Sequence, residues 1–155
     1  MSDTINMYCM ECKDWIDDWG EHRCPSGFWV VTDKEMVGIA SKLYAMGVTP
    51  LSTIWTATEM SARDDYEYLL SVKIDIGRRI NEAILGELPN GWKYFFETVT
   101  PDRSELHMLA YTERWYNFGF ESVDERIEEI IKEFERYLET RDCEAVKALL
   151  LLTTG

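Results

Sequence analysis

The middle of the chain alternates hydrophobic and polar residues in a way that predicts strands. Over residues 66–76, Tyr68, Leu70, Val72, Ile74 and Ile76 alternate with Glu67, Ser71, Lys73 and Asp75. A period of two is expected of a strand with one buried face. Residues 51–58, rich in Thr, Ile and Trp, are predicted to pair with that strand across the polar loop 59–65. Residues 92–99 and 105–113 predict a second hairpin, joined by a turn that contains Pro101 and Asp102.

Elsewhere the apolar residues recur at helical spacing. A first helix is predicted over residues 33–46, where Thr32 and Glu35 have the spacing of a capping box and Gly47 is placed for a left-handed stop. Another helix is predicted after Gly77, ending at 89–91, and a short last helix is predicted over 142–152. Ala145, Val146, Leu149 and Leu150 are expected to dock that last helix.

The longest helix is predicted over residues 122–139, opened by a second capping box of Ser122 and Glu125. Its apolar stripe, which we expect to be buried, consists of Val123, Ile127, Ile130, Ile131, Phe134 and Leu138. The opposite face is acidic. The region 121–144 holds ten acidic residues against four basic ones. Such a face either keeps the protein soluble or attracts a basic partner.

Together these elements predict one α+β domain over residues 1–155. The order helix, strand, strand occurs twice, in 32–76 and 77–113, which suggests an α-β-β pseudo-repeat within a core of residues 32–120. Its two β-hairpins would form an antiparallel sheet, covered on one face by the C-terminal helices of 121–155. Residues 1–31 form a separate N-terminal Cys/His segment.

That N-terminal segment contains a candidate metal site. Two residues separate Cys9 from Cys12, and His22 and Cys24 follow closely. Thiolate and imidazole are preferred zinc ligands, so these four residues could bind one structural zinc ion. Four protein ligands leave no open position for catalysis. The alternatives are an amphipathic helix that buries both thiols and, less favoured, redox chemistry of the C-x-x-C pair.

Composition and charge narrow the classes of partner. The formal net charge of −13 argues against direct binding of nucleic acid or of an anionic membrane, because both need clustered basic residues. The longest apolar runs are too short to cross a bilayer. The chain opens without a signal-peptide pattern, so we expect a cytoplasmic protein whose cysteines are reduced or metal-bound.

Catalytic patterns are weak. His107 is expected on the polar, exposed side of a strand, without a nearby nucleophile in sequence. Arg78 and Arg79, at a predicted helix start, could hold an anion, but surface pairing with local acids is the favoured interpretation. The chain contains no P-loop, GxGxxG or nucleophile-elbow motif.

Aromatic residues give the last candidate site. Trp115, Tyr116 and Phe118 precede the acidic helix, and such side chains are common anchors at protein interfaces. The alternative is that they close the ends of the sheet. With Glu128, Glu129 and Glu133 of the helix, they are our candidate partner-binding residues.

The sequence therefore favours a small regulatory or adaptor domain that binds a protein. A basic protein and a second copy of this chain, in a homodimer, are the candidate partners. Two alternatives stay open. An acidic mimic of nucleic acid would need carboxylates spaced along a ridge like the phosphates of a duplex. An unrecognised enzyme would need a deep pocket with convergent polar groups.

Overall fold

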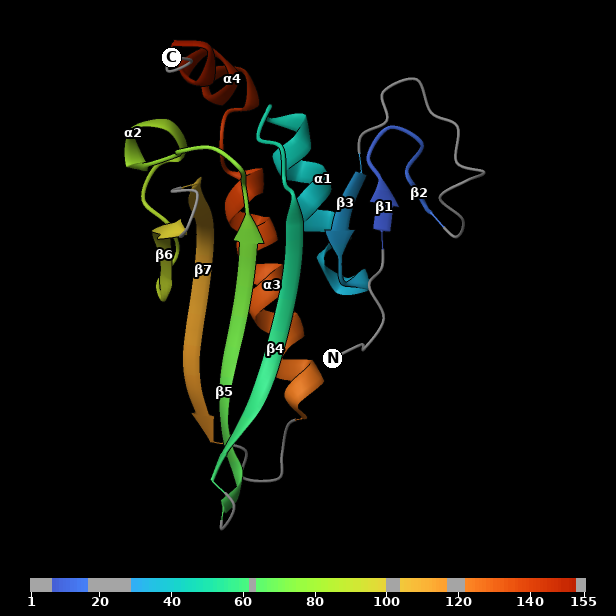
Figure 1. Ribbon diagram of the computed structural model, residues 1–155, viewed down its shortest axis with the longest axis vertical. Coiled ribbons are helices and arrows are strands. Elements are labelled where there is room, and N and C mark those ends of the chain that lie inside the picture. The colour runs from blue at the N-terminus through green and yellow to red at the C-terminus, as the bar shows by residue number, and fades with distance from the viewer. Residues whose placement is uncertain (1–6, 17–28, 62–63, 100–103, 117–121, 153–155) are drawn as a thin grey trace.

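The computed structural model describes residues 7–16, 29–61, 64–99, 104–116 and 122–152. These residues build one seven-stranded sheet with the strand order β2-β1-β3-β4-β5-β7-β6. Figure 1 shows the sheet in front of the long helix α3 (Val123–Glu139), which packs on its far face. The predicted α+β class, with an antiparallel sheet and C-terminal helices packed on it, is confirmed.

Two hairpins form the larger part of the sheet. β4 (Ser52–Ser61) pairs with β5 (Asp64–Asp75), and β6 (Trp92–Val99) pairs with β7 (Ser104–Tyr116), both in antiparallel fashion. β5 and β7 join the two hairpins side by side, again antiparallel. The order β4-β5-β7-β6 is therefore symmetric about the β5–β7 pair, as a helix-strand-strand repeat would require.

Alternation along β5 separates the two faces of this sheet. Leu70, Val72 and Ile74 are fully buried beneath the helices, together with their strand neighbours Trp55, Leu109 and Tyr111. We call the opposite side the open face. It carries the odd-numbered residues of β5 from Glu67 to Asp75, the residues paired with them on β4 and β7, and Lys93, Phe95 and Glu97 of β6.

The N-terminal segment adds three strands that the hydrophobic pattern did not predict. They are β1 (Met7–Cys9), β2 (Asp14–Trp15) and β3 (Trp29–Thr32). β1 pairs antiparallel with both β2 and β3, whereas β3 pairs parallel with β4. The sheet as a whole is therefore mixed, because the chain passes from β3 to β4 through a helix rather than a hairpin.

The first helix is shorter than predicted and is capped differently. It consists of a 3-10 turn η1 (Lys34–Met36) and α1 (Val37–Ala45). Thr32 does not cap it, because its hydroxyl donates to the carbonyl of Asp33 at 2.9 Å and contacts the hydroxyl of Thr53. The capping box with Glu35 was therefore wrong. Gly47 does adopt the predicted left-handed conformation, with φ of 87°.

α3 forms as predicted. The hydroxyl of Ser122 accepts a hydrogen bond from the amide of Glu125 at 3.1 Å, which confirms this capping contact. Phe134, at the centre of the stripe, is fully buried and stacks on Trp92 with ring centroids 4.1 Å apart. The buried residues of α3 are Ile127, Ile130, Ile131, Phe134 and Leu138, while Val123 is partly exposed.

The two remaining helices correct the prediction in detail. α2 (Glu82–Leu85) is a single turn. It starts at Asn81, whose side-chain oxygen accepts a hydrogen bond from the amide of Ala83 at 2.9 Å. α4 (Cys143–Leu152) has the predicted extent, but only Val146 and Leu150 are buried, and Ala145 and Leu149 are exposed. Among the described residues, no helix combines the length and apolar character needed to cross a membrane.

Candidate partner-binding surfaces

The acidic residues of α3 lie on the side of the helix that points away from the sheet. Glu128, Glu129 and Glu133 are all exposed, and we refer to them as the acidic surface of α3. Glu128 pairs with Lys132 at 2.9 Å, and Glu129 pairs with Arg126 at 3.0 Å. Exposed pairs of this kind contribute little to stability.

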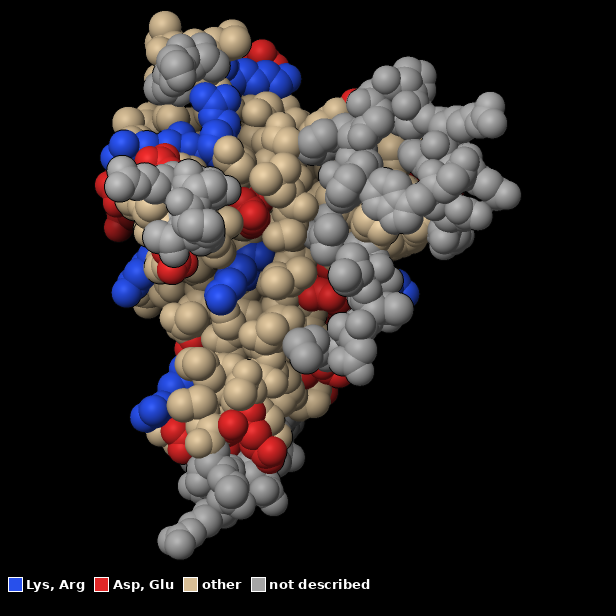
Figure 2. Space-filling view, in the orientation of Figure 1, with Lys and Arg blue, Asp and Glu red and all other residues tan. Residues whose placement is uncertain are grey.

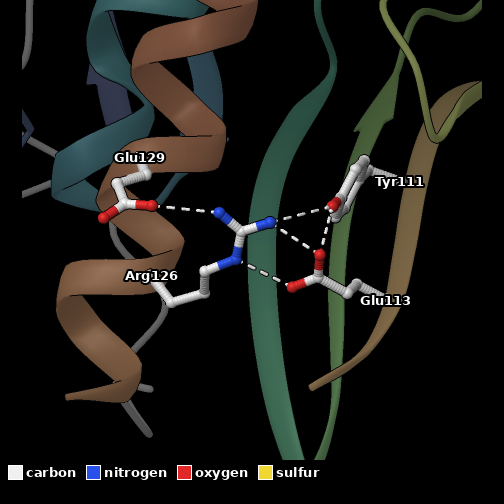
Figure 3. A network of polar contacts seen from close by, with 4 residues as sticks. All are labelled: Tyr111, Glu113, Arg126 and Glu129. Atoms are coloured by element: carbon white, nitrogen blue, oxygen red, sulfur yellow. Dashed lines mark hydrogen bonds and ion pairs between the residues drawn. The ribbon is translucent and has the colours of Figure 1, made fainter. Parts of the chain in front are cut away.

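A polar network ties the start of α3 to β7 (Figure 3). The guanidinium of Arg126 donates to both carboxylate oxygens of Glu113, at 2.8 and 2.6 Å, and to Glu129 at 3.0 Å. The hydroxyl of Tyr111 donates to Glu113 at 2.9 Å. A two-point arginine–carboxylate contact is geometrically specific, so it fixes how α3 approaches the strand.

Protonation in this network follows from those contacts. The hydrogen bonds from Arg126 hold the pKa of the Glu113 carboxyl below its usual value, against the opposing effect of burial. Burial and the neighbouring Glu113 carboxylate raise the pKa of the Tyr111 hydroxyl to about 12. At neutral pH the network therefore contains an ionised carboxylate, a charged guanidinium and a neutral phenol.

The predicted aromatic residues do not form one cluster. Trp115 and Tyr116 are consecutive residues of β7 and therefore lie on opposite faces of the sheet. Trp115 is partly buried against the core, with its ring centroid 6.1 Å from that of Tyr68. Tyr116 is 45% exposed on the open face, and Phe118 lies outside the described residues.

The open face is the surface that the sequence analysis missed. No described helix covers it, and Figure 2, which views this side, shows mostly uncharged side chains with separate basic and acidic ones. Four large apolar side chains on it are substantially exposed: Ile54 (37%), Leu69 (37%), Phe95 (44%) and Tyr116 (45%). These four side chains come one from each of the strands β4, β5, β6 and β7, so exposed apolar residues are distributed across the whole of this face.

Shallow clefts surround the loop between α2 and β6. Two of them have volumes of about 650 and 660 Å³, and Glu87, Leu88 and Pro89 line both. Tyr137 donates to the carbonyl of Leu85 at 3.0 Å, and Tyr94 donates to that of Gly86 at 2.5 Å. Burial raises the pKa of both hydroxyls. These groups hold the loop in place, which is a structural role.

Two weaker sequence candidates are corrected. His107 is 7% exposed rather than solvent-facing, because its ring stacks on Phe96 and its Nε2 atom lies 3.0 Å from a Glu105 carboxylate oxygen. Arg78 is not at a helix start, since α2 begins later, and its guanidinium donates to the carbonyl of Leu150 at 3.3 Å.

The cysteine pair lies in the turn between β1 and β2. Cys9 ends β1 and is buried, and Cys12 is exposed in the turn that follows. The amide of Cys12 donates to the Cys9 sulfur at 3.3 Å, and Lys13 adopts a left-handed conformation with φ of 56°. The amphipathic-helix alternative for this stretch is therefore wrong. His22 and Cys24 lie outside the described residues.

Comparisons with protein-family models, curated proteins and solved structures gave no match.

Proposed function

We propose that this protein is a small regulatory or adaptor domain that acts by binding another protein. The observation that carries the proposal is the sheet itself, because the described helices cover one face and leave exposed apolar side chains on the other. The acidic surface of α3 is the second support. It lies on a different side of the molecule, so two separate surfaces are available for contacts.

The partner that fits the acidic surface of α3 is a basic protein. Glu128, Glu129 and Glu133 are exposed on a chain whose net charge is already −13. Charge of one sign attracts an oppositely charged surface over distances of the order of the Debye length, about 8 Å at physiological salt. Association should therefore be fast at low ionic strength and slow down as salt is added.

Charge reversal tests this proposal. A partner is first recovered by affinity capture from the native cytoplasm, and its association rate is then measured with purified proteins. Replacing Glu128, Glu129 and Glu133 by Lys should slow association roughly ten-fold or more at low salt, and the difference should shrink near 0.5 M salt. Equal slowing of a matched control, with Glu59, Glu87 and Glu144 replaced by Lys, would show that only net charge matters.

The same experiment separates the alternatives. If the captured partner binds DNA or RNA and nucleic acid displaces this protein, the acidic surface acts as a nucleic-acid mimic. An enzyme would instead show turnover that these reversals leave unchanged. The described geometry offers no separate argument for catalysis, since the tyrosine hydroxyls at the clefts already hold the α2–β6 loop.

We also propose that the N-terminal segment binds one structural zinc ion through Cys9, Cys12, His22 and Cys24. The two proposed ligands that the structure describes, Cys9 and Cys12, support the proposal. The amide of Cys12 donates to the Cys9 sulfur at 3.3 Å, so the turn between β1 and β2 folds the chain around that sulfur. Cys12 follows Cys9 by three positions and lies in the tight turn, where its side chain is exposed.

A further inference from the structure

The open face differs from the rest of the molecule in its charge. Its described acidic residues are Glu67, Asp75 and Glu97, and its basic residues are Lys73, Lys93 and Arg114. The two signs balance, although the whole chain carries −13. The excess negative charge therefore lies elsewhere, and the open face is the surface through which two copies can approach without net repulsion.

The signs are also arranged along the strands in a way that suits a second copy. On β5, Lys73 lies between Asp75 at one end and Glu67 near the other. On β6, Lys93 is followed on the same face by Glu97. A copy related by a two-fold axis that lies in the plane of the sheet, perpendicular to the strands and level with Leu70, presents the charges of β5 in the reverse order. This places Lys73 of each chain over Glu67 of the other. Two-fold interfaces between identical chains are self-complementary in this sense.

The sizes of the side chains on the open face suit the same two-fold arrangement. Ser71, in the centre of β5, is only 8% exposed and pairs with Thr112 of β7, and the small Ala110 is the next residue of β7 on the same face, paired with Lys73. Leu69, a larger exposed side chain, is the next residue of β5 on this face, and the exposed Phe95 lies two strands away on β6. The Ser71 hydroxyl is already buried and, among the described residues, has no hydrogen-bond partner, so covering it adds little further cost of desolvation.

The size of the face is adequate for a stable dimer. β4, with ten residues, is about 33 Å long at roughly 3.3 Å per residue, and four strands span about 19 Å at a spacing of roughly 4.8 Å. The projected area is therefore roughly 600 Å² before side-chain relief is added, against about 800 Å² of accessible surface per partner in a standard interface.

We infer that two copies of this protein form a homodimer by packing their open faces against each other. Side chains of the two sheets would interdigitate at a separation of about 10 Å between sheets. The inference is independent of the basic partner proposed above. Because α3 lies on the opposite side of the sheet, the dimer leaves both acidic surfaces of α3 free.

A pair of complementary charge variants tests this inference. In the first, Lys73→Glu and Lys93→Glu make the open face strongly acidic. In the second, Glu97→Lys and Asp75→Asn make it basic, and Asn keeps an oxygen to accept from the amide of Gly77, as Asp75 does at 3.1 Å. Neither variant alters the pair of Arg114 and Glu67, whose atoms lie 3.1 Å apart.

Sedimentation equilibrium at about 0.1 M salt should show a dimer for the natural chain and at least about 100-fold weaker self-association for each variant alone. Mixing the two variants should restore a dimer with one chain of each. A control with Lys34→Glu and Lys147→Glu makes the same change in net charge as the first variant, away from the open face, and should remain dimeric.

The inference is overturned if the natural chain is monomeric at about 1 mM, a concentration at which even weak specific interfaces associate. It is also overturned if the dimer persists in both variants, or if the mixture stays monomeric while each variant keeps the circular dichroism spectrum of the natural chain. A monomer that still binds a basic partner through α3 would leave the proposed function intact and exclude only the homodimer.

Discussion

At the scale of single residues, the contact between Glu113 and Arg126 has a consequence for pH. Arg126 keeps the pKa of Glu113 in the folded protein below its unfolded value of about 4.5. A carboxyl whose pKa is lowered by folding stabilises the fold fully above its unfolded pKa, and that stabilisation disappears as the pH falls through the folded pKa. The contact should therefore act at neutral pH and fade below about pH 4.5.

Glu113→Gln tests this expectation. At pH 7 the substitution should lower the free energy of unfolding by about 1–3 kcal/mol, because it removes hydrogen bonds to a charged partner that is only 24% exposed. Urea titrations at pH 7 and pH 3 should show the difference from the natural chain shrinking in acid. Glu128→Gln, in an exposed pair with Lys132, should cost under about 0.5 kcal/mol at either pH. A deficit of equal size at both pH values would contradict the assigned role.

A second residue-scale prediction concerns Phe134. Its ring is fully buried and packs against Trp92 and Tyr137, so removing it leaves a cavity that the sheet and helix cannot close. Phe134→Ala should lower the free energy of unfolding by about 3–5 kcal/mol, whereas the adjacent, exposed Glu133→Ala should change it by under about 0.5 kcal/mol. Chemical denaturation measures both. An unchanged midpoint for Phe134→Ala would mean that the α3 stripe is not a core element.

At the scale of elements, the sequence predicted those whose pattern is long and regular. The twelve residues of β5 alternate clearly, and the stripe of α3 extends over seventeen residues, so both were located well. Short elements were not. β1 and β3 have three and four residues, too few for a period to emerge, and α2 is one turn started by Asn81 rather than by Gly77.

The candidate surfaces were predictable to a lesser degree. The acidic surface of α3 follows from charge placed opposite an apolar stripe, which the sequence shows directly. The open face depends on which side of the sheet the helices cover, a tertiary property that alternation alone does not specify. Trp115 and Tyr116 illustrate the same limit, since adjacent aromatic residues in a strand face opposite sides and do not act as one anchor.

At the scale of the whole molecule, the two proposed interfaces complement each other. Packing two open faces together would bury the exposed apolar side chains and place an α3 helix on each outer side of the dimer. Two identical acidic surfaces would then point away from each other. A dimer of this kind can engage two basic sites at once, and linked binding raises the apparent affinity without any new contact. Dimerisation and partner binding would thus reinforce each other.

The described residues form two hydrophobic cores, and this division bears on the proposed zinc site. The main core lies between α3 and the strands β4, β5, β6 and β7. A smaller core, formed by Tyr8, Met10, Val30 and Ala40, lies between the N-terminal strands and α1. Cys9 and Cys12 lie in the N-terminal segment, beside the smaller core. Loss of the metal should therefore loosen β1, β2 and β3 while the main core stays folded.

Protein purified without chelator should therefore contain about one mole of zinc per mole of chain by elemental analysis. Cys9→Ala should lose the metal and speed amide hydrogen exchange in β1 and β3, with exchange in β5 and β7 unchanged. Cys143→Ala, in α4 and away from the turn, is the matched control and should keep the zinc. Less than about a tenth of a mole of zinc in the natural chain would refute the site. Faster exchange throughout the sheet in Cys9→Ala would show instead that the two cores unfold as one unit, because the small core would then be required for the stability of the large one.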